Sequence, residues 1–234
     1  MILPATQMPL HLNPYELYQL KNFYFAQTEL ASAVESFCER TNLSFLYLWG
    51  GPASGKTHLL LAIAEQAQKD SKTMLYLPLA ELVRTASPEV LEGVEGLNFL
   101  CLDELGSISG KSEWEEALFH CFNRLEMSGC QLIVASRNNP AASAIKLPDL
   151  MSRMASGLIY QLDSLNDSAK EKVLIVQSRA RGLAMSNEVA QYLLRNYSRD
   201  LNKLIGLLQS LDKASMSEKR RLTIPFVRQI LCSA

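Results

Sequence analysis

The stretch from Gly50 to Thr57 has residue types and a spacing that suit binding of a phosphorylated ligand. It reads Gly-Gly-Pro-Ala-Ser-Gly-Lys-Thr and fits the phosphate-loop pattern G-x-x-x-x-G-K-[ST] without departure. Glycines let backbone N–H groups converge on one point, and a following helix adds unpaired donors and its positive dipole end. Lys56 can then reach the β and γ phosphates, and the Thr57 hydroxyl can bind Mg²⁺. The stretch predicts a nucleoside-phosphate site.

A second chemical pattern is an acidic pair that follows the apolar run 98–102. Asp103 and Glu104 come directly after that run, as in a Walker B motif. Asp103 can then hold Mg²⁺ through water, and Glu104 can orient a hydrolytic water. Such pairs are common alone, but together with an intact phosphate loop they favour an NTPase site. We expect metal ligands at Thr57 and Asp103. The expected nucleotide contacts are Pro52, Ala53, Ser54, Gly55, Lys56, Thr57 and His58.

Strands and helices alternate around these motifs. Short apolar runs predict strands at 45–49, 73–77, 98–102, 131–135 and 158–162. Helical spacing predicts helices at 28–38, 58–68, 88–97 and 113–127. This alternation is typical of an α/β fold in which a five-stranded parallel sheet has helices on both faces.

After Asp163 the pattern becomes purely helical. Helices are predicted at 167–181, 187–196, 201–214 and 225–231, which together would form a small all-α lid domain. The expected organisation is an N-terminal arm at 1–18, an α/β nucleotide-binding domain at 19–163 and the helical lid at 164–234.

Composition limits the classes of partner. The net charge is −1, so the chain has no overall basic field of the kind that non-specific DNA binding uses. The five cysteines are scattered through apolar segments without a C-x-x-C pair, which indicates reduced core residues. No apolar run is long enough to span a bilayer. We expect a cytoplasmic protein without membrane attachment.

The motifs and their order resemble the AAA+ ATPases, and more closely the branch that contains the replication initiator DnaA. The resemblance runs from Asn22 and Phe23 through the helical lid. It implies a P-loop module that binds ADP or ATP with Mg²⁺, has DnaA as a partner and forms a homo-oligomer. The segment 147–153, Leu-Pro-Asp-Leu-Met-Ser-Arg, resembles the L-x-S-R segment of that branch. There the arginine is a finger toward a neighbouring subunit's nucleotide, so the resemblance implies that Arg153 acts in trans on DnaA.

Two positions depart from the pattern of the branch. Arg137 follows the fourth predicted strand where the family usually has an acid, and Asn202 stands where the sensor arginine would fall. Lys203 or Arg199 could replace that sensor arginine, and Lys203 is therefore a further expected nucleotide contact, although an ammonium lacks the planar fork of a guanidinium. These departures leave open whether Glu104 supports hydrolysis in this chain's own site.

The N-terminal arm contains a candidate docking peptide. The stretch Gln7-Met8-Pro9-Leu10-His11-Leu12 resembles the Q-L-x-L-x-L peptides that dock on the DNA polymerase sliding clamp. The amide of Gln7 can both donate and accept hydrogen bonds, while Met8, Leu10 and Leu12 can fill an apolar groove. DnaA continues into a DNA-binding domain after its lid, whereas this chain stops at Ala234. We therefore expect no sequence-specific DNA binding.

These features together imply a nucleotide-bound regulator that works with the DNA-loaded sliding clamp. It would stimulate hydrolysis of DnaA-bound ATP and so inhibit initiation of replication. Lys56, Asp103 and Glu104 equally permit a self-contained AAA+ ATPase or a helicase loader. A non-catalytic adaptor that tethers DnaA to the clamp would have no need of Arg153.

The arm gives a first prediction. Replacing Gln7 by Ala, or Leu10 and Leu12 together by Ala, should abolish clamp binding, because the docking peptide then loses its polar anchor or its apolar contacts. The thermal unfolding midpoint and nucleotide affinity should stay unchanged, because a terminal arm contributes little to a core. Retention on immobilised clamp measures the effect, and equal retention of variant and native chains would contradict the assignment.

Overall fold

Five short apolar runs form one parallel sheet. The computed structural model describes residues 18–39, 43–218 and 221–232. The strands are β1 (Phe45–Trp49), β2 (Met74–Pro78), β3 (Phe99–Asp103), β4 (Gln131–Ser136) and β5 (Leu158–Gln161). They lie in the order β2-β3-β4-β1-β5, and every pairing is parallel. The predicted five-stranded parallel sheet is therefore confirmed, and no strand end differs from its prediction by more than one residue.

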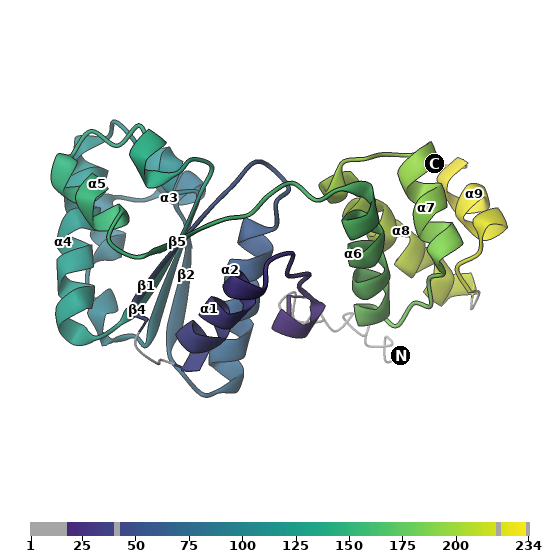
Figure 1. The fold of residues 1–234 in the computed structure, drawn as a ribbon, viewed down its shortest axis with the longest axis horizontal. Helices are drawn as coiled ribbons and strands as arrows, with labels where there is room; N and C mark the ends of the chain where they lie inside the picture. Colours follow the sequence, from purple (N-terminus) through teal and green to yellow (C-terminus); the bar gives the residue numbers. More distant parts are fainter. Residues whose placement is uncertain (1–17, 40–42, 219–220, 233–234) are drawn as a thin grey trace, which may run out of the picture.

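Helices cover both faces of this sheet (Figure 1). One face packs against α3 (Leu79–Thr85), α4 (Ser112–Ser128) and α5 (Pro148–Met154), and the other against α1 (Thr28–Glu39) and α2 (Lys56–Lys69). Successive side chains of a strand point to opposite faces, so strands buried on both sides need continuous apolar sequence.

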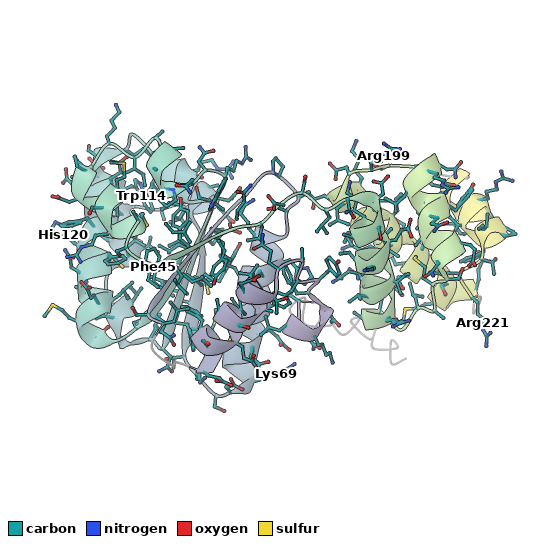
Figure 2. The ribbon with its side chains drawn as sticks, viewed as in Figure 1. Phe45, Lys69, Trp114, His120, Arg199 and Arg221 are labelled. Carbon is teal, nitrogen blue, oxygen red and sulfur yellow. The ribbon has the colours of Figure 1, made fainter. Side chains whose placement is uncertain are left out.

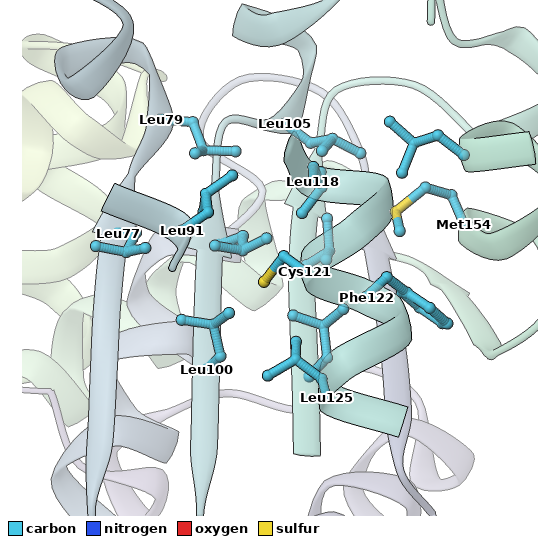
Figure 3. Packing of buried hydrophobic residues seen from close by; sticks show 14 of the residues in the cluster. Leu77, Leu79, Leu91, Leu100, Leu105, Leu118, Cys121, Phe122, Leu125 and Met154 are labelled. Carbon is cyan, nitrogen blue, oxygen red and sulfur yellow. The ribbon is translucent and has the colours of Figure 1, made fainter. Parts of the chain in front are cut away.

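Strand β1 shows this alternation. Phe45 and Tyr47 belong to the core on the α4 side, and Leu46 and Leu48 belong to the core on the α2 side. Figure 2 shows Phe45 and Trp114, both in the core on the α4 side. Figure 3 shows Cys121, Phe122 and Leu125 of α4 facing that side of the sheet, with Met154 of α5 nearby.

The prediction of a helix at 88–97 is wrong. This segment forms two 3₁₀ turns, η3 (Pro88–Leu91) and η4 (Val94–Gly96). Between them Gly93 has a φ of 70°, a left-handed conformation that interrupts helical hydrogen bonding. The helices α3 and α5, which pack on this face of the sheet, were not predicted. Each has only 7 residues, too few to show an apolar period.

In its described residues, the chain after β5 forms four helices with a core of their own. They are α6 (Asp167–Ala180), α7 (Asn187–Asn196), α8 (Leu201–Glu218) and α9 (Ile224–Cys232). Leu193, Leu204 and Phe226 are among the buried residues of this core. Side chains cap these helices: Asn166 accepts from Ala169 N–H at 2.9 Å, Ser186 caps α7 and Asp200 accepts from Lys203 N–H at 3.1 Å at the start of α8. Thr223 accepts from Phe226 N–H at 3.4 Å at the start of α9. The predicted helical lid is confirmed, with α8 extending beyond 214.

The lid contacts the α/β part through the segment that precedes α1. Gln177 of α6 donates a hydrogen bond to the carbonyl of Asn22 at 3.2 Å, and the Lys172 ammonium lies 5.7 Å from the Tyr24 ring centroid. In Figure 1, α6 is the lid helix nearest to α1 and α2. Within the described ranges, no helix combines the length and apolarity needed to cross a membrane. The predicted arm, apart from Tyr18, lies outside the described residues, as do Gln7, Met8, Leu10 and Leu12.

Candidate functional site

The loop between β1 and α2 follows a path that two glycines permit. A Cβ on Gly50 would overlap the carbonyl oxygen of Leu162, so the chain passes too close there for any side chain. Gly55 has a φ of 94°, which disfavours residues with a Cβ. Ala53 also has a positive φ, 57°, and this is uncommon for a residue other than glycine. The loop therefore has the tightly curved backbone, with positive φ angles at Ala53 and Gly55, that the phosphate-loop motif predicts.

The Lys56 ammonium lies inside the curve of this loop. It donates to the carbonyl oxygens of Gly50 and Gly51, each at 2.7 Å, and to the Ser54 hydroxyl at 3.1 Å. Burial lowers the pKa of Lys56, and the nearby Asp103 carboxylate opposes that shift. The ammonium is thus held at the loop, where an anionic ligand would replace neutral carbonyl acceptors with negatively charged oxygens.

The two motifs meet at Asp103. The Thr57 hydroxyl donates to Asp103 Oδ2 at 2.6 Å, although the residues are 46 positions apart. Asp103 Oδ1 accepts from the backbone N–H of Glu104 at 2.8 Å, and Tyr76 donates its hydroxyl to Oδ2 at 3.0 Å. A hydroxyl beside a carboxylate is the oxygen donor set that Mg²⁺ prefers. The predicted metal ligands are therefore brought together, and the residues present fit a nucleotide with Mg²⁺.

Glu104 has a strained backbone. Its φ is 57° and its ψ is 44°, and it precedes the 3₁₀ turn η5 (Leu105–Ile108) with its side chain exposed. Left-handed residues other than glycine cost about 1–3 kcal/mol and gather at functional sites. The change of backbone direction at Glu104 makes the two acidic side chains point different ways, so that Asp103 is buried and Glu104 faces solvent.

A cavity of about 460 Å³ lies between the loop and the lid. Six of the predicted nucleotide-contacting residues line it, whereas the exposed Pro52 is not among the described lining residues. The six are Ala53, Ser54, Gly55, Lys56, Thr57 and His58. The size is typical of small-molecule sites.

His58 forms one wall of this cavity. Its ring makes edge-to-face contacts with Tyr18, at 5.1 Å between centroids, and with Phe23, at 5.5 Å. Burial lowers its pKa to about 4, and the charge of Arg181 adds to the shift. The ring is therefore neutral at pH 7 and presents an aromatic, uncharged wall.

Among the described lid residues that line the cavity, Arg181 is the one with a positive charge. It donates to the carbonyl and to the side-chain oxygen of Gln177, at 2.7 and 2.9 Å. Neither Arg199 nor Lys203 is among the described lining residues. Arg199, labelled in Figure 2, is exposed, and its Nε lies 3.8 Å from Asp167 Oδ2. Lys203 is exposed and follows the lining residue Asn202. Sequence reasoning missed Arg181, whose only signal was its place at the end of the predicted helix 167–181.

Arg153 lies on the opposite face of the sheet from the phosphate loop. It stands on α5, donates to Glu126 Oε2 at 3.0 Å and has its Cζ 5.6 Å from the Phe122 ring centroid. Its side chain remains 38% exposed. Since α5 packs with α4 whereas α2 covers the other face, Arg153 does not join the group around Lys56 and Asp103.

A buried carboxylate joins the two segments that bear Glu104 and Arg153. Glu115 is 2% exposed and accepts from the N–H of Gly110 at 2.6 Å, just after η5. Its other oxygen accepts from the N–H groups of Lys146 and Leu147, at 2.9 and 2.8 Å, just before α5. Sequence reasoning missed this residue, because an acidic residue in a helix's first turn normally indicates only dipole complementarity.

Comparison with known proteins agrees with this geometry. Residues 21–161 match the bacterial DnaA ATPase domain, and residues 167–231 match the Hda lid domain. An uncharacterized protein of Haemophilus influenzae is 40% identical over 227 residues, which span 96% of this chain and 98% of that protein.

Solved structures of DnaA are similar as well. Domain III of Thermotoga maritima DnaA has a TM-score of 0.74 at 21% identity, covering 92% of this chain and 96% of that one. AMPPCP-bound DnaA from Aquifex aeolicus has a TM-score of 0.69 at 26% identity, covering 89% of this chain and 68% of that one.

The sheet order, the loop-lid cavity and the Thr57–Asp103 contact define an AAA+ nucleotide-binding module with a helical lid. The matches to the ATPase domain and to the lid cover both parts of that module. The chain belongs to the bacterial DnaA ATPase-domain family, as an Hda-like AAA+ regulator of DnaA.

Glu115 gives a prediction about stability. Glu115→Gln should lower the free energy of unfolding by about 2 kcal/mol or more, because an amide N–H₂ would face backbone donors in a buried place. Chemical denaturation measures the change. Glu116→Gln is the matched control, since Glu116 is the exposed neighbour on the same helix, and it should change little. Equal effects of the two substitutions would contradict the assigned contacts.

Proposed function

We propose that this chain is a nucleotide-bound regulator that acts with the DNA-loaded sliding clamp to stimulate hydrolysis of DnaA-bound ATP. Replication initiation would thereby be limited. The observation that supports this best is the position of Arg153, which is partly exposed on the face opposite its own phosphate loop. An arginine there suits a neighbour's nucleotide better than its own.

The cavity between loop and lid would hold an adenine nucleotide with Mg²⁺. The relatives solved with AMPPCP support this ligand class for the family. Lys56 would meet phosphate charge, Thr57 and Asp103 would hold the ion, and Arg181 would approach from the lid. The phosphate charge of a bound nucleotide would attract Lys56 of the α/β part and Arg181 of the lid. The nucleotide would thereby fix the lid against the α/β part.

Arg153 would act as the finger toward DnaA. Its ion pair with Glu126 is exposed, and exposed pairs contribute only about 0–1 kcal/mol, so a partner's phosphate can displace Glu126. A finger arginine stabilises charge that develops on the γ-phosphate during transfer. The planar guanidinium can contact two phosphate oxygens at once.

The remaining partners follow from the arm and from the family. The peptide with Gln7, Met8, Leu10 and Leu12 would place the chain on the clamp, close to DnaA. Tethering raises the local concentration of the finger at DnaA without further contacts. Homo-oligomer formation and a cytoplasmic location belong to the same proposal.

A self-contained ATPase is the alternative, and the intact contact between Thr57 and Asp103 favours it. Glu104 would then orient water for hydrolysis in this chain's own site. The two functions differ in which substitution stops phosphate release: Arg153→Ala for the regulator, and Glu104→Gln for the self-contained ATPase.

The phosphate loop gives a prediction about affinity. Lys56→Ala should weaken ADP binding by about tenfold or more, about 1.4 kcal/mol, because a charge-assisted contact to phosphate is lost. Isothermal calorimetry measures the change. Lys69→Ala, at the exposed far end of the same helix, is the matched control and should bind ADP normally. Unchanged affinity after Lys56→Ala would show that the loop is not the site.

The finger gives the prediction that tests the function. Arg153→Ala should reduce stimulated hydrolysis of DnaA-bound ATP by about a thousandfold, and Arg153→Lys should rescue little because the planar fork is lost. ADP and clamp binding should persist in both. The assay follows labelled ATP preloaded on DnaA, with the clamp loaded on DNA.

Two further variants complete that assay. Arg195→Ala, an exposed arginine of α7, is the matched control and should retain full stimulation. Glu104→Gln should leave stimulation largely intact if this chain's nucleotide is only a ligand. Loss of stimulation in Glu104→Gln with retention in Arg153→Ala would instead support the self-contained ATPase.

A further inference from the structure

The hydroxyl of Tyr76 contacts the carboxylate of Asp103, although neither sequence motif includes this tyrosine. It donates to Oδ2 at 3.0 Å, the same oxygen that accepts from Thr57 at 2.6 Å. The N–H of Glu104 donates to Oδ1 at 2.8 Å. Donors therefore hold both oxygens of a carboxylate that is 2% exposed. With both oxygens engaged, the carboxylate has little freedom to rotate.

The register of the sheet explains why a tyrosine reaches this place. Tyr76 on β2 pairs with Cys101 on β3, so Asp103, two residues further on, is its diagonal neighbour on the same face. Diagonal neighbours lie about 7–8 Å apart, a gap that a long aromatic side chain can span. Phenylalanine would fill the same space but would bring no donor.

The Tyr76 hydroxyl acts on Asp103 as a hydrogen-bond donor. Thr57 differs, because its hydroxyl is itself placed to serve as a metal ligand beside Asp103.

We infer that Tyr76 is a positioning residue that orients Asp103 toward the Mg²⁺ of the bound nucleotide. The inference rests on the proposed nucleotide site, since it assigns a partner to that site's metal ligand. Residues that orient a metal ligand typically change metal affinity by about 10–100-fold when they are removed. The effect should therefore appear in the Mg²⁺ requirement of nucleotide binding, without a change in metal-free binding.

The test compares Tyr76→Phe with Tyr47→Phe. Tyr47 is fully buried on β1 and donates to the Asn138 carbonyl at 3.0 Å, so the control removes a similar hydroxyl that does not touch Asp103. Calorimetric titration with ADP is carried out at a series of Mg²⁺ concentrations and in EDTA. Thermal unfolding confirms that each variant is folded.

Tyr76→Phe should raise the Mg²⁺ concentration for half-maximal tightening of ADP binding by about tenfold. Affinity in EDTA should be unchanged, and Tyr47→Phe should resemble the native chain. In an Asp103→Asn background, Tyr76→Phe should have no additional effect, because the tyrosine acts through that carboxylate.

Three results would each overturn the inference alone. They are a native Mg²⁺ requirement in Tyr76→Phe, equal shifts in both tyrosine variants, and an additional loss in the Asp103→Asn background. If ADP binding by the native chain were indifferent to Mg²⁺, the proposed metal site would fail and the inference with it. The two failures are therefore distinguishable.

Discussion

The hydrogen bond between Thr57 and Asp103 is the contact on which the nucleotide site depends. It joins the first turn of α2, the helix that follows β1, to the end of β3, and strand β4 lies between β1 and β3 in the sheet. The contact forms only if all strands run parallel, so that their carboxyl ends share one edge, and if the loop after β1 can curve tightly. Gly50 meets the second condition, because a Cβ there would overlap the backbone of Leu162. Phosphate binding and metal binding are therefore consequences of one sheet geometry.

The second organising feature is that the sheet separates two charged groups. Lys56 and the lid residue Arg181 border the cavity on the side of α2, and Arg153 lies on the side of α4 and α5. Glu115 bridges the segments that follow Glu104 and precede Arg153 through buried backbone hydrogen bonds. Buried hydrogen bonds thus connect the turn after β3 to the start of the helix that bears Arg153.

The sequence predicted the features that local spacing determines. The phosphate loop, the acidic pair and the strands were found because each is a short run with its own chemistry or apolar pattern. The helix expected at 88–97 failed because Gly93 takes a left-handed conformation that breaks the period. Tyr76 could not be found, since its contact with Asp103 depends on the register between β2 and β3. Glu115 was missed for a similar reason, because its donors Lys146 and Leu147 lie 31 and 32 positions away. Arg181 was missed because the phosphate loop, which lines the same cavity, is far away in the chain.

The central claim is that Arg153 serves ATP held by DnaA while this chain's own nucleotide acts only as a ligand. The most direct measurement loads this chain with ADP, which has no γ-phosphate, and loads DnaA with γ-labelled ATP in the presence of clamp on DNA. Every labelled phosphate released then comes from DnaA. We expect rapid release of labelled phosphate with the ADP-loaded native chain. Release at the unstimulated rate, restored only when this chain holds hydrolysable ATP, would contradict it.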